Sequence, residues 1–155
     1  MSRFPTLRAT DLDGRAYDVP AGLPAGPQVL LVAFKRWHQV LIEMWKARLR
    51  PLEREFPCLS VWEVPVLSRV YAPARPFIDG GMRAGITDPA VRRRTLTTYV
   101  DLDSFASALG LDDFETVHVF LVGPDGEVVW RASGKPESEA VSSLAEVLAW
   151  LSPGS

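Results

Sequence analysis

The hydrophobic pattern changes its period between Phe34 and His38. From Val29 to Phe34 the chain is continuously apolar, which is typical of a central strand buried on both faces. From His38 onward apolar residues recur every three or four positions, which predicts an amphipathic helix. The stripe expected to face the core consists of Leu41, Ile42, Trp45, Leu49, Leu52 and Phe56. The turn between strand and helix is the first candidate for a functional site, because open α/β sheets place their sites at such turns.

A second strand follows this helix. Pro57 ends the helical pattern, and Leu59–Val64 alternates with a period of two. Pro51 lies inside the helical stretch and is expected to kink or divide it, because proline has no N–H for the preceding turn. A strand, a long helix and a second strand form a βαβ unit, so the two strands should pair in parallel with a right-handed crossover.

Residues 65–96 are the least regular part of the chain. They are rich in tyrosine, phenylalanine, methionine and isoleucine, in which disordered segments are poor. We therefore expect a packed excursion with short helices near Ser68–Pro73 and Pro89–Thr95, the second capped by Asp88. Long excursions inside a compact domain are usually functional.

The other expected elements are short and bounded by turns or caps. In chain order they are a hairpin of Leu7–Asp11 and Arg15–Asp18 around an Asp-Gly turn, a strand at Thr97–Asp101, a helix at Asp103–Leu109 closed by Gly110, a strand at Val117–Val122, a turn at Gly123–Gly126, a strand at Glu127–Ala132 and a helix at Ser138–Leu151. The order predicts an α/β fold: one domain over residues 1–155 with a mixed central sheet, helices on both faces and an N-terminal β-hairpin.

Composition limits the classes of partner. The net charge is −2, from 17 basic and 19 acidic residues, which gives no general attraction to nucleic acid or to an anionic membrane. The N-terminus has no apolar signal region, and no apolar stretch is long enough to span a bilayer. We expect a cytoplasmic protein, with a protein or small molecule as its unidentified partner and an oligomeric state that the sequence does not give.

Cys58 is the single cysteine of the chain. A disulfide within the chain is therefore impossible, and so is a zinc site built from several cysteines. With Phe56, Pro57 and Leu59 around it, Cys58 is expected to be a small buried hydrophobic residue.

The chain resembles the thioredoxin-like superfamily, and within it the peroxiredoxin-like or redoxin-like branch. The resemblance runs from about Leu7 to Leu151 and rests on the order of elements, the opening "DLDGR" and the stretch "FLVGPDGEVVWRASG". It implies a thioredoxin-like fold. The stretch "RPFIDGGMRAGI" is similar to a divergent redoxin-like group related to ATPase assembly factors of the ATP10 kind.

The resemblance also implies where a reactive cysteine would lie. Thioredoxins and peroxiredoxins carry it at the turn between strand and helix, but this chain has no cysteine from Met1 to Pro57. The first-cysteine position falls among Trp37, His38 and Gln39, and none of these can form a mixed disulfide or a sulfenate. The proline that usually faces the motif is also missing before His118. We therefore expect no catalytic residue here.

A binding pocket is the alternative use of this region. The residues expected to form it are Arg36, Trp37, His38 and Gln39 at the turn, Arg69, Arg75, Asp79 and Arg83 in the excursion, and His118 in a later strand. Asp79–Gly85 has the glycines of a backbone anion nest, but the same residues fit a simple glycine turn with its arginines in ion pairs. His38 fits either a ligand-binding group or a structural capping residue. Two histidines without a third ligand do not favour a metal site, and no cofactor is expected.

Two classes of function remain. The first is a non-catalytic binding or assembly protein on a redoxin-like scaffold. The second is an antioxidant thiol oxidoreductase that would use Cys58 with an external thiol, or a non-thiol activity that would involve His38.

Overall fold

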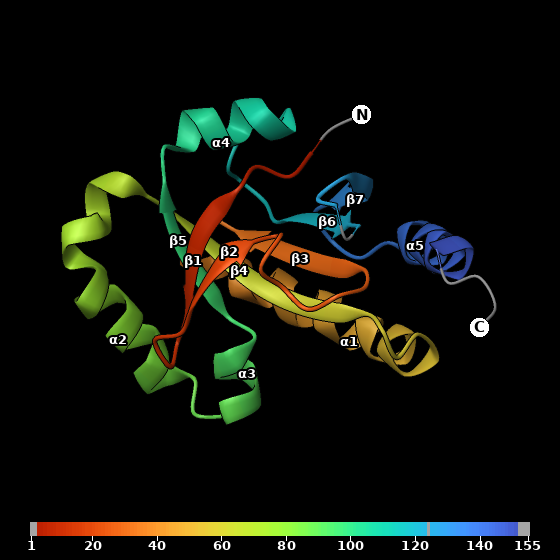
Figure 1. The fold of residues 1–155 in the computed structure, drawn as a ribbon, viewed down its shortest axis with the longest axis horizontal. Coiled ribbons are helices and arrows are strands. Elements are labelled where there is room, and N and C mark those ends of the chain that lie inside the picture. Colours follow the sequence, from red (N-terminus) through yellow and green to blue (C-terminus); the bar gives the residue numbers. More distant parts are fainter. Residues whose placement is uncertain (1–2, 124, 152–155) are drawn as a thin grey trace.

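A single seven-stranded sheet organises the molecule (Figure 1). The structure is a computed structural model, and it describes residues 3–123 and 125–151. The strands are β1 (Leu7–Asp11), β2 (Ala16–Val19), β3 (Gln28–Ala33), β4 (Ser60–Ser68), β5 (Leu96–Val100), β6 (His118–Val122) and β7 (Val128–Ser133). The helices are η1 (Arg36–His38), α1 (Gln39–Glu55), η2 (Arg69–Ala74), α2 (Arg75–Gly85), α3 (Pro89–Arg93), α4 (Leu102–Leu109) and α5 (Ser138–Leu151). The strand order is β2-β1-β5-β4-β3-β6-β7.

The predicted βαβ unit forms the centre of this sheet. β3 pairs in parallel with β4 and antiparallel with β6, so the sheet is mixed as expected. β4 pairs in parallel with β5, and the N-terminal hairpin of β1 and β2 joins β5 through β1. The hairpin of β6 and β7 is antiparallel, and the turn predicted within it includes residue 124, which lies outside the described residues.

Helices cover both faces of the sheet. On one face, α1 and α5 pack on the side chains of Val29 and Leu31 in β3. On the other face, α4 and the N-terminal segment pack on Leu30 and Val32 of the same strand. All four of these β3 residues are buried, so the prediction of a strand buried on both faces is confirmed.

α1 buries the predicted stripe. Leu41, Ile42, Trp45, Leu49 and Leu52 are buried in the helix, and Phe56 is buried at its end. Pro51 does not divide α1, which continues to Glu55. The carbonyl that loses its donor belongs to Ala47, an exposed residue, so water can satisfy it.

The excursion is more helical than its sequence suggests. η2 and α3 correspond to the two predicted short helices, and Asp88 caps α3 by accepting a hydrogen bond from the N–H of Ala90 at 2.9 Å. The helix α2 between them was not predicted, and both the glycine turn and the anion nest expected at Asp79–Gly85 are wrong. These residues lie inside α2, and none of its glycines has the positive φ that a nest requires.

Candidate functional site

The turn between β3 and α1 is organised by His38. This residue ends η1, where the imidazole folds back over the turn and is fully buried. Its Nδ1 accepts hydrogen bonds from the backbone N–H groups of Phe34, at 3.0 Å, and Lys35, at 3.2 Å. Free N–H groups at such a turn would attract an anion. Here the side chain of His38 already occupies two of them.

This arrangement fixes the protonation of His38. Because Nδ1 accepts two hydrogen bonds, the neutral ring carries its proton on Nε2, which is buried and forms no hydrogen bond of normal geometry with the described residues. Burial lowers the pKa of His38, while the backbone carbonyl of Glu115 opposes that shift. His38 is therefore held as a neutral imidazole, in the structural role that the sequence left open.

His118 lies beside the same turn. It pairs with Val32 at the end of β3, and its ring centroid lies 6.1 Å from that of Phe34. Its Nε2 is also buried, and no group in residues 3–123 or 125–151 forms a hydrogen bond with it. Burial lowers the pKa of His118, and the charge of Arg131 adds to the effect. Within the described residues, no group of three or more histidine, cysteine, aspartate or glutamate side chains could hold a metal ion.

An apolar stripe runs along the outer side of the same helical segment. Trp37, Val40 and Met44 are 56%, 66% and 39% exposed. They are three and four positions apart, so they lie on one face of the helix, next to the exposed Arg36 and Gln39. The sequence does contain a signal for the exposure of Val40 and Met44, because both are apolar residues that lie outside the predicted core stripe.

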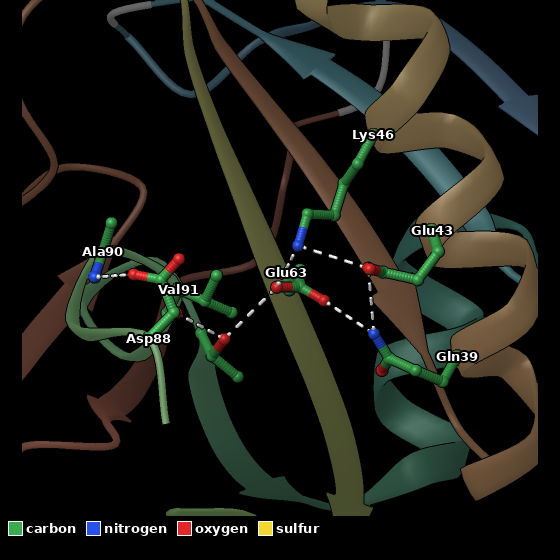
Figure 2. A network of polar contacts seen from close by, with 8 residues as sticks. Gln39, Glu43, Lys46, Glu63, Asp88, Ala90 and Val91 are labelled. Carbon is green, nitrogen blue, oxygen red and sulfur yellow. Dashed lines mark hydrogen bonds and ion pairs between the residues drawn. The ribbon is translucent and has the colours of Figure 1, made fainter. Parts of the chain in front are cut away.

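A buried carboxylate joins α1 to the excursion (Figure 2). Glu63 of β4 is buried and accepts hydrogen bonds from Gln39 at 3.1 Å and Lys46 at 3.2 Å. The Thr95 hydroxyl lies 3.3 Å from Glu63 and shares its single proton with the carbonyl of Val91, which is nearer at 2.8 Å. Burial disfavours the ammonium of Lys46, but Glu63 and Glu43 outweigh that cost and raise its pKa. Sequence analysis missed this network, because Glu63 in an alternating strand looks like a solvent-facing residue.

Arg75 and Asp79 are engaged with the sheet. Asp79 accepts hydrogen bonds from the hydroxyls of Tyr99, at 2.9 Å, and Thr97, at 3.1 Å, and forms an ion pair of 3.5 Å with Arg75. The guanidinium of Arg75 lies 4.7 Å from the centre of the Tyr99 ring. Burial and the hydrogen bond to Asp79 raise the pKa of Tyr99. These contacts attach α2 to β5.

The other two arginines of the predicted pocket form exposed ion pairs. Arg69 pairs with Asp101 at 3.4 Å, and Arg83 pairs with Asp13 at 3.8 Å. Across residues 3–123 and 125–151, no hydrogen bond or ion pair joins Arg69, Arg75, Asp79 or Arg83 to the residues of the turn. The shared binding role of the two groups stays a prediction.

Cys58 is exposed, so its expected burial was wrong. It lies in the turn between α1 and β4, two residues before that strand begins, and a turn residue need not point into either core. It follows the far end of α1, so α1 separates it from the turn that carries His38.

Comparison with known proteins identifies the fold. No family model and no curated protein matches this sequence. Among solved structures, yeast Sco1 with copper bound has a TM-score of 0.64 at 13% identity, covering 99% of this chain and 96% of that one. The exposed lipoprotein thioredoxin Etrx1 of Streptococcus pneumoniae has a TM-score of 0.61 at 11% identity, covering 92% and 99%.

A third structure of this kind is DsbF, described as MTB dsbF in mixed oxidised and reduced forms, with a TM-score of 0.51 at 15% identity over 95% of this chain and 96% of that one. At these identities the similarity establishes the fold and not the activity. The fold of this protein is thioredoxin-like, as its sequence indicates.

Proposed function

We propose that this protein is a non-catalytic binding or assembly module on a thioredoxin-like scaffold. The observation that carries the proposal is the occupation of the turn between β3 and α1 by the imidazole of His38. Its Nδ1 accepts the backbone N–H groups of Phe34 and Lys35, which leaves them unavailable to a thiolate or another anion.

The distribution of cysteine supports the same conclusion. Disulfide exchange and peroxide reduction both need a thiolate nucleophile. The single cysteine, Cys58, lies in the turn beyond the far end of α1, and one cysteine cannot form a disulfide within the chain. Copper binding and oxidised or reduced forms are properties of the structural neighbours named above.

The proposed binding surface is the exposed side of the turn. Arg36, Trp37 and Gln39 form it together with the stripe that continues through Val40 and Met44. An exposed apolar stripe bordered by polar groups suits a protein partner better than a small charged molecule. His38 and His118 support this surface from below, and Arg69, Arg75, Asp79 and Arg83 are proposed as a further part of it. A cytoplasmic location stays a prediction.

An antioxidant thiol oxidoreductase is the second candidate function. It is favoured by one observation, the exposure of Cys58, since an exposed thiol is accessible to an external thiol donor. In this case Cys58 would act alone and would need that donor in every cycle.

Activity assays separate the two functions. Insulin reduction and peroxide consumption would be measured with thioredoxin or glutathione as the donor. We expect the native protein and its Cys58→Ser variant to match the background rate. Turnover of the native protein well above that of the variant would overturn the non-catalytic proposal.

A partner assay tests the surface itself. Crosslinking with mass spectrometry would identify proteins bound to the native chain, and the same partner should be lost from a Trp37→Ala, Val40→Ala double variant. Trp150→Ala is the matched control, because Trp150 is another exposed tryptophan on a different helix. Equal loss from the control would show that the binding is not specific to the turn.

A further inference from the structure

The exposed apolar stripe at the turn continues along the outer side of α1. Its residues are separated by three, four, three and four positions, which is the spacing of the first and fourth positions of a heptad. Every one of them is exposed, so the described part of the chain leaves this narrow seam open. An apolar seam with heptad spacing is the surface by which one helix packs along another. The seam consists of Trp37, Val40, Met44, Ala47 and Pro51.

The seam points away from the sheet. The buried stripe of α1 is centred near Trp45 and Leu49, whereas the seam is centred near Met44 and Ala47. With about 100° between successive residues, the two stripes lie more than a right angle apart around the helix. A second helix can therefore lie along the seam without approaching the sheet.

Charged residues border the seam on both sides. Glu43 and Arg50 hold the seventh heptad position on one side, and Arg48 and Glu55 hold the fifth position on the other. In two parallel helices, a seventh position lies opposite the fifth position of the next heptad in the other helix. In a parallel pair of α1 helices, Glu43 would face Arg48 of the second copy, and Arg50 would face its Glu55. Both pairs have opposite charges.

The antiparallel arrangement would bring like charges together. When the two seams run in opposite directions, Val40 of one helix packs beside Met44 of the other. Glu43 then faces its own copy, and Arg36 faces Arg50. Charges of this kind set the orientation of paired helices. The charge pattern of α1 therefore favours a parallel pair, which is a closed arrangement with twofold symmetry.

The bordering charges are accessible to a partner. Within residues 3–123 and 125–151, Arg50 and Glu55 form no ion pair. The carboxylate of Glu43 lies 3.2 Å from the ammonium of Lys46, and the side chain of Glu43 is still 57% exposed. Arg48 is exposed, and its Nη1 donates one hydrogen bond, of 3.3 Å, to a backbone carbonyl. A guanidinium has further N–H groups for a carboxylate.

We propose that a second copy of this chain occupies the seam, so that two α1 helices pack in parallel in a symmetric dimer. This inference rests on the proposed function, because it takes the stripe at the turn as a surface for a protein partner. α1 is already folded on the sheet, so a short seam does not have to stabilise the helix itself. Because the contact is small, we expect a weak dimer with a Kd on the order of tens of micromolar.

Sedimentation equilibrium of the full chain tests dimer formation. A concentration series that spans the expected Kd should show monomer and dimer in exchange. Met44→Glu should weaken the dimer by about tenfold or more, because it places a carboxylate in the middle of the seam. Phe77→Glu is the matched control, since Phe77 is an apolar residue of α2 that is 89% exposed. We expect it to leave the dimer unchanged.

Exchange of charges tests the pairing across the seam. Arg50→Glu would place two carboxylates opposite each other, and Glu55→Arg would place two guanidinium groups opposite each other. Each variant alone should dimerise about tenfold more weakly or worse. An equimolar mixture of the two variants should recover the native affinity, because every pair in the mixed dimer again has opposite charges. Arg93→Glu on α3 is the control for reversal of an exposed charge outside the seam.

The single cysteine measures the orientation of the two helices. Cys58 is exposed and follows the C-terminal end of α1, so the native chain can carry one spin label there. In the antiparallel arrangement the C-terminal ends of the two α1 helices would lie about 40 Å apart, at a rise of 1.5 Å or so per residue. In the parallel dimer these ends lie side by side. We therefore expect a distance between the labels well below about 40 Å.

Four results would overturn the proposed dimer. They are a chain that stays monomeric, control variants that weaken the dimer as much as the seam variants, a mixture that does not recover, and labels about 40 Å apart or more. Crosslinking of a different protein at Trp37 and Val40 would still support the proposed function in each case. Turnover that depends on Cys58 would overturn the proposed function and leave the dimer intact.

Discussion

The two longest helices before β5 are held to the sheet in different ways. α1 has 17 residues and buries five of them against the core, whereas α2 has 11 residues and buries none. α1 lies along β3 and β4, while α2 lies to one side of β5 and β1 in the view of Figure 1. α2 is attached mainly by polar contacts, which run from Asp79 to Tyr99 and Thr97 and from Arg92 to the carbonyls of Arg83 and Ile86.

The difference indicates that α1 is part of the stable core, whereas α2 is a peripheral helix. Apolar burial contributes about 25 cal/mol per Å² and does not depend on exact geometry. A typical intramolecular hydrogen bond contributes a net free energy of about 0.5–1.5 kcal/mol to stability, and it requires a particular geometry. α2 should therefore open locally more readily than α1, which is a property that binding elements often have.

The largest expected effect is on α1. Trp45 is fully buried, and its indole N–H donates to the carbonyl of Gly134 at 2.7 Å. Trp45→Ala should lower the free energy of unfolding by about 3–5 kcal/mol, because it leaves a cavity and an unpaired carbonyl. Urea melts followed by circular dichroism would measure this change.

Phe77→Ala on α2 is the matched control. Phe77 is 89% exposed, so its truncation should change the free energy of unfolding by less than about 0.5 kcal/mol. Similar losses in the two variants would contradict the distinction between the helices.

The second effect tests the polar attachment of α2. Asp79→Ala removes the acceptor of the Tyr99 and Thr97 hydroxyls and should lower the free energy of unfolding by about 1–3 kcal/mol. Amide hydrogen exchange should accelerate in α2 well before it does in α1. Asp112→Ala serves as the control, since Asp112 is exposed and accepts no hydrogen bond among the described side chains. Unchanged exchange in α2 would mean that Asp79 does not hold this helix.

The smallest effect is a dependence on pH that arises at the start of α1. The pKa of His38 is lowered by burial, so the unfolded chain, with a histidine pKa of about 6.5, binds the proton more readily than the folded one. Stability from this residue is therefore fully present above pH 6.5 or so and is lost as the pH falls toward the folded pKa. At about pH 6 the loss is at most about 0.8 kcal/mol for each such histidine.

Urea melts at about pH 7.5 and 6 would measure this dependence. His118 has a pKa shifted in the same direction, so His38→Gln should remove part of the dependence and a double variant with His118→Gln more of it. α2 contains no histidine. After correction for the intrinsic pH dependence of amide exchange, the protection of its amides relative to that of global unfolding should therefore not change with pH. Stability that rises on acidification would contradict the assignment.

Most of the fold could be predicted because its elements have strong local patterns. The apolar run of β3 and the stripe of α1 indicated their type, their burial and their parallel connection to β4. α2 could not be predicted, because Gly80, Gly81 and Gly85 lower its intrinsic helix propensity. Its stability comes from tertiary contacts such as that of Asp79 with Tyr99, which no local pattern contains.

The candidate site was predicted less completely than the fold. The absence of cysteine at the turn could be read directly, and so could the position of His38 there. The hydrogen-bond partners of His38 depend on how its side chain folds back on the turn. The partners of Glu63 depend on how the fold brings α1 and Thr95 close to β4. Such contacts arise from three-dimensional packing, so the network around Glu63 became visible only in the structure.

The exposed thiol of Cys58 sets a limit on covalent association. Each chain has one sulfur atom that can be oxidised to a disulfide, so each chain can form one disulfide bond to another molecule. Oxidation in air would therefore stop at pairs of chains joined in the turn between α1 and β4. Longer disulfide-linked polymers of this protein cannot form.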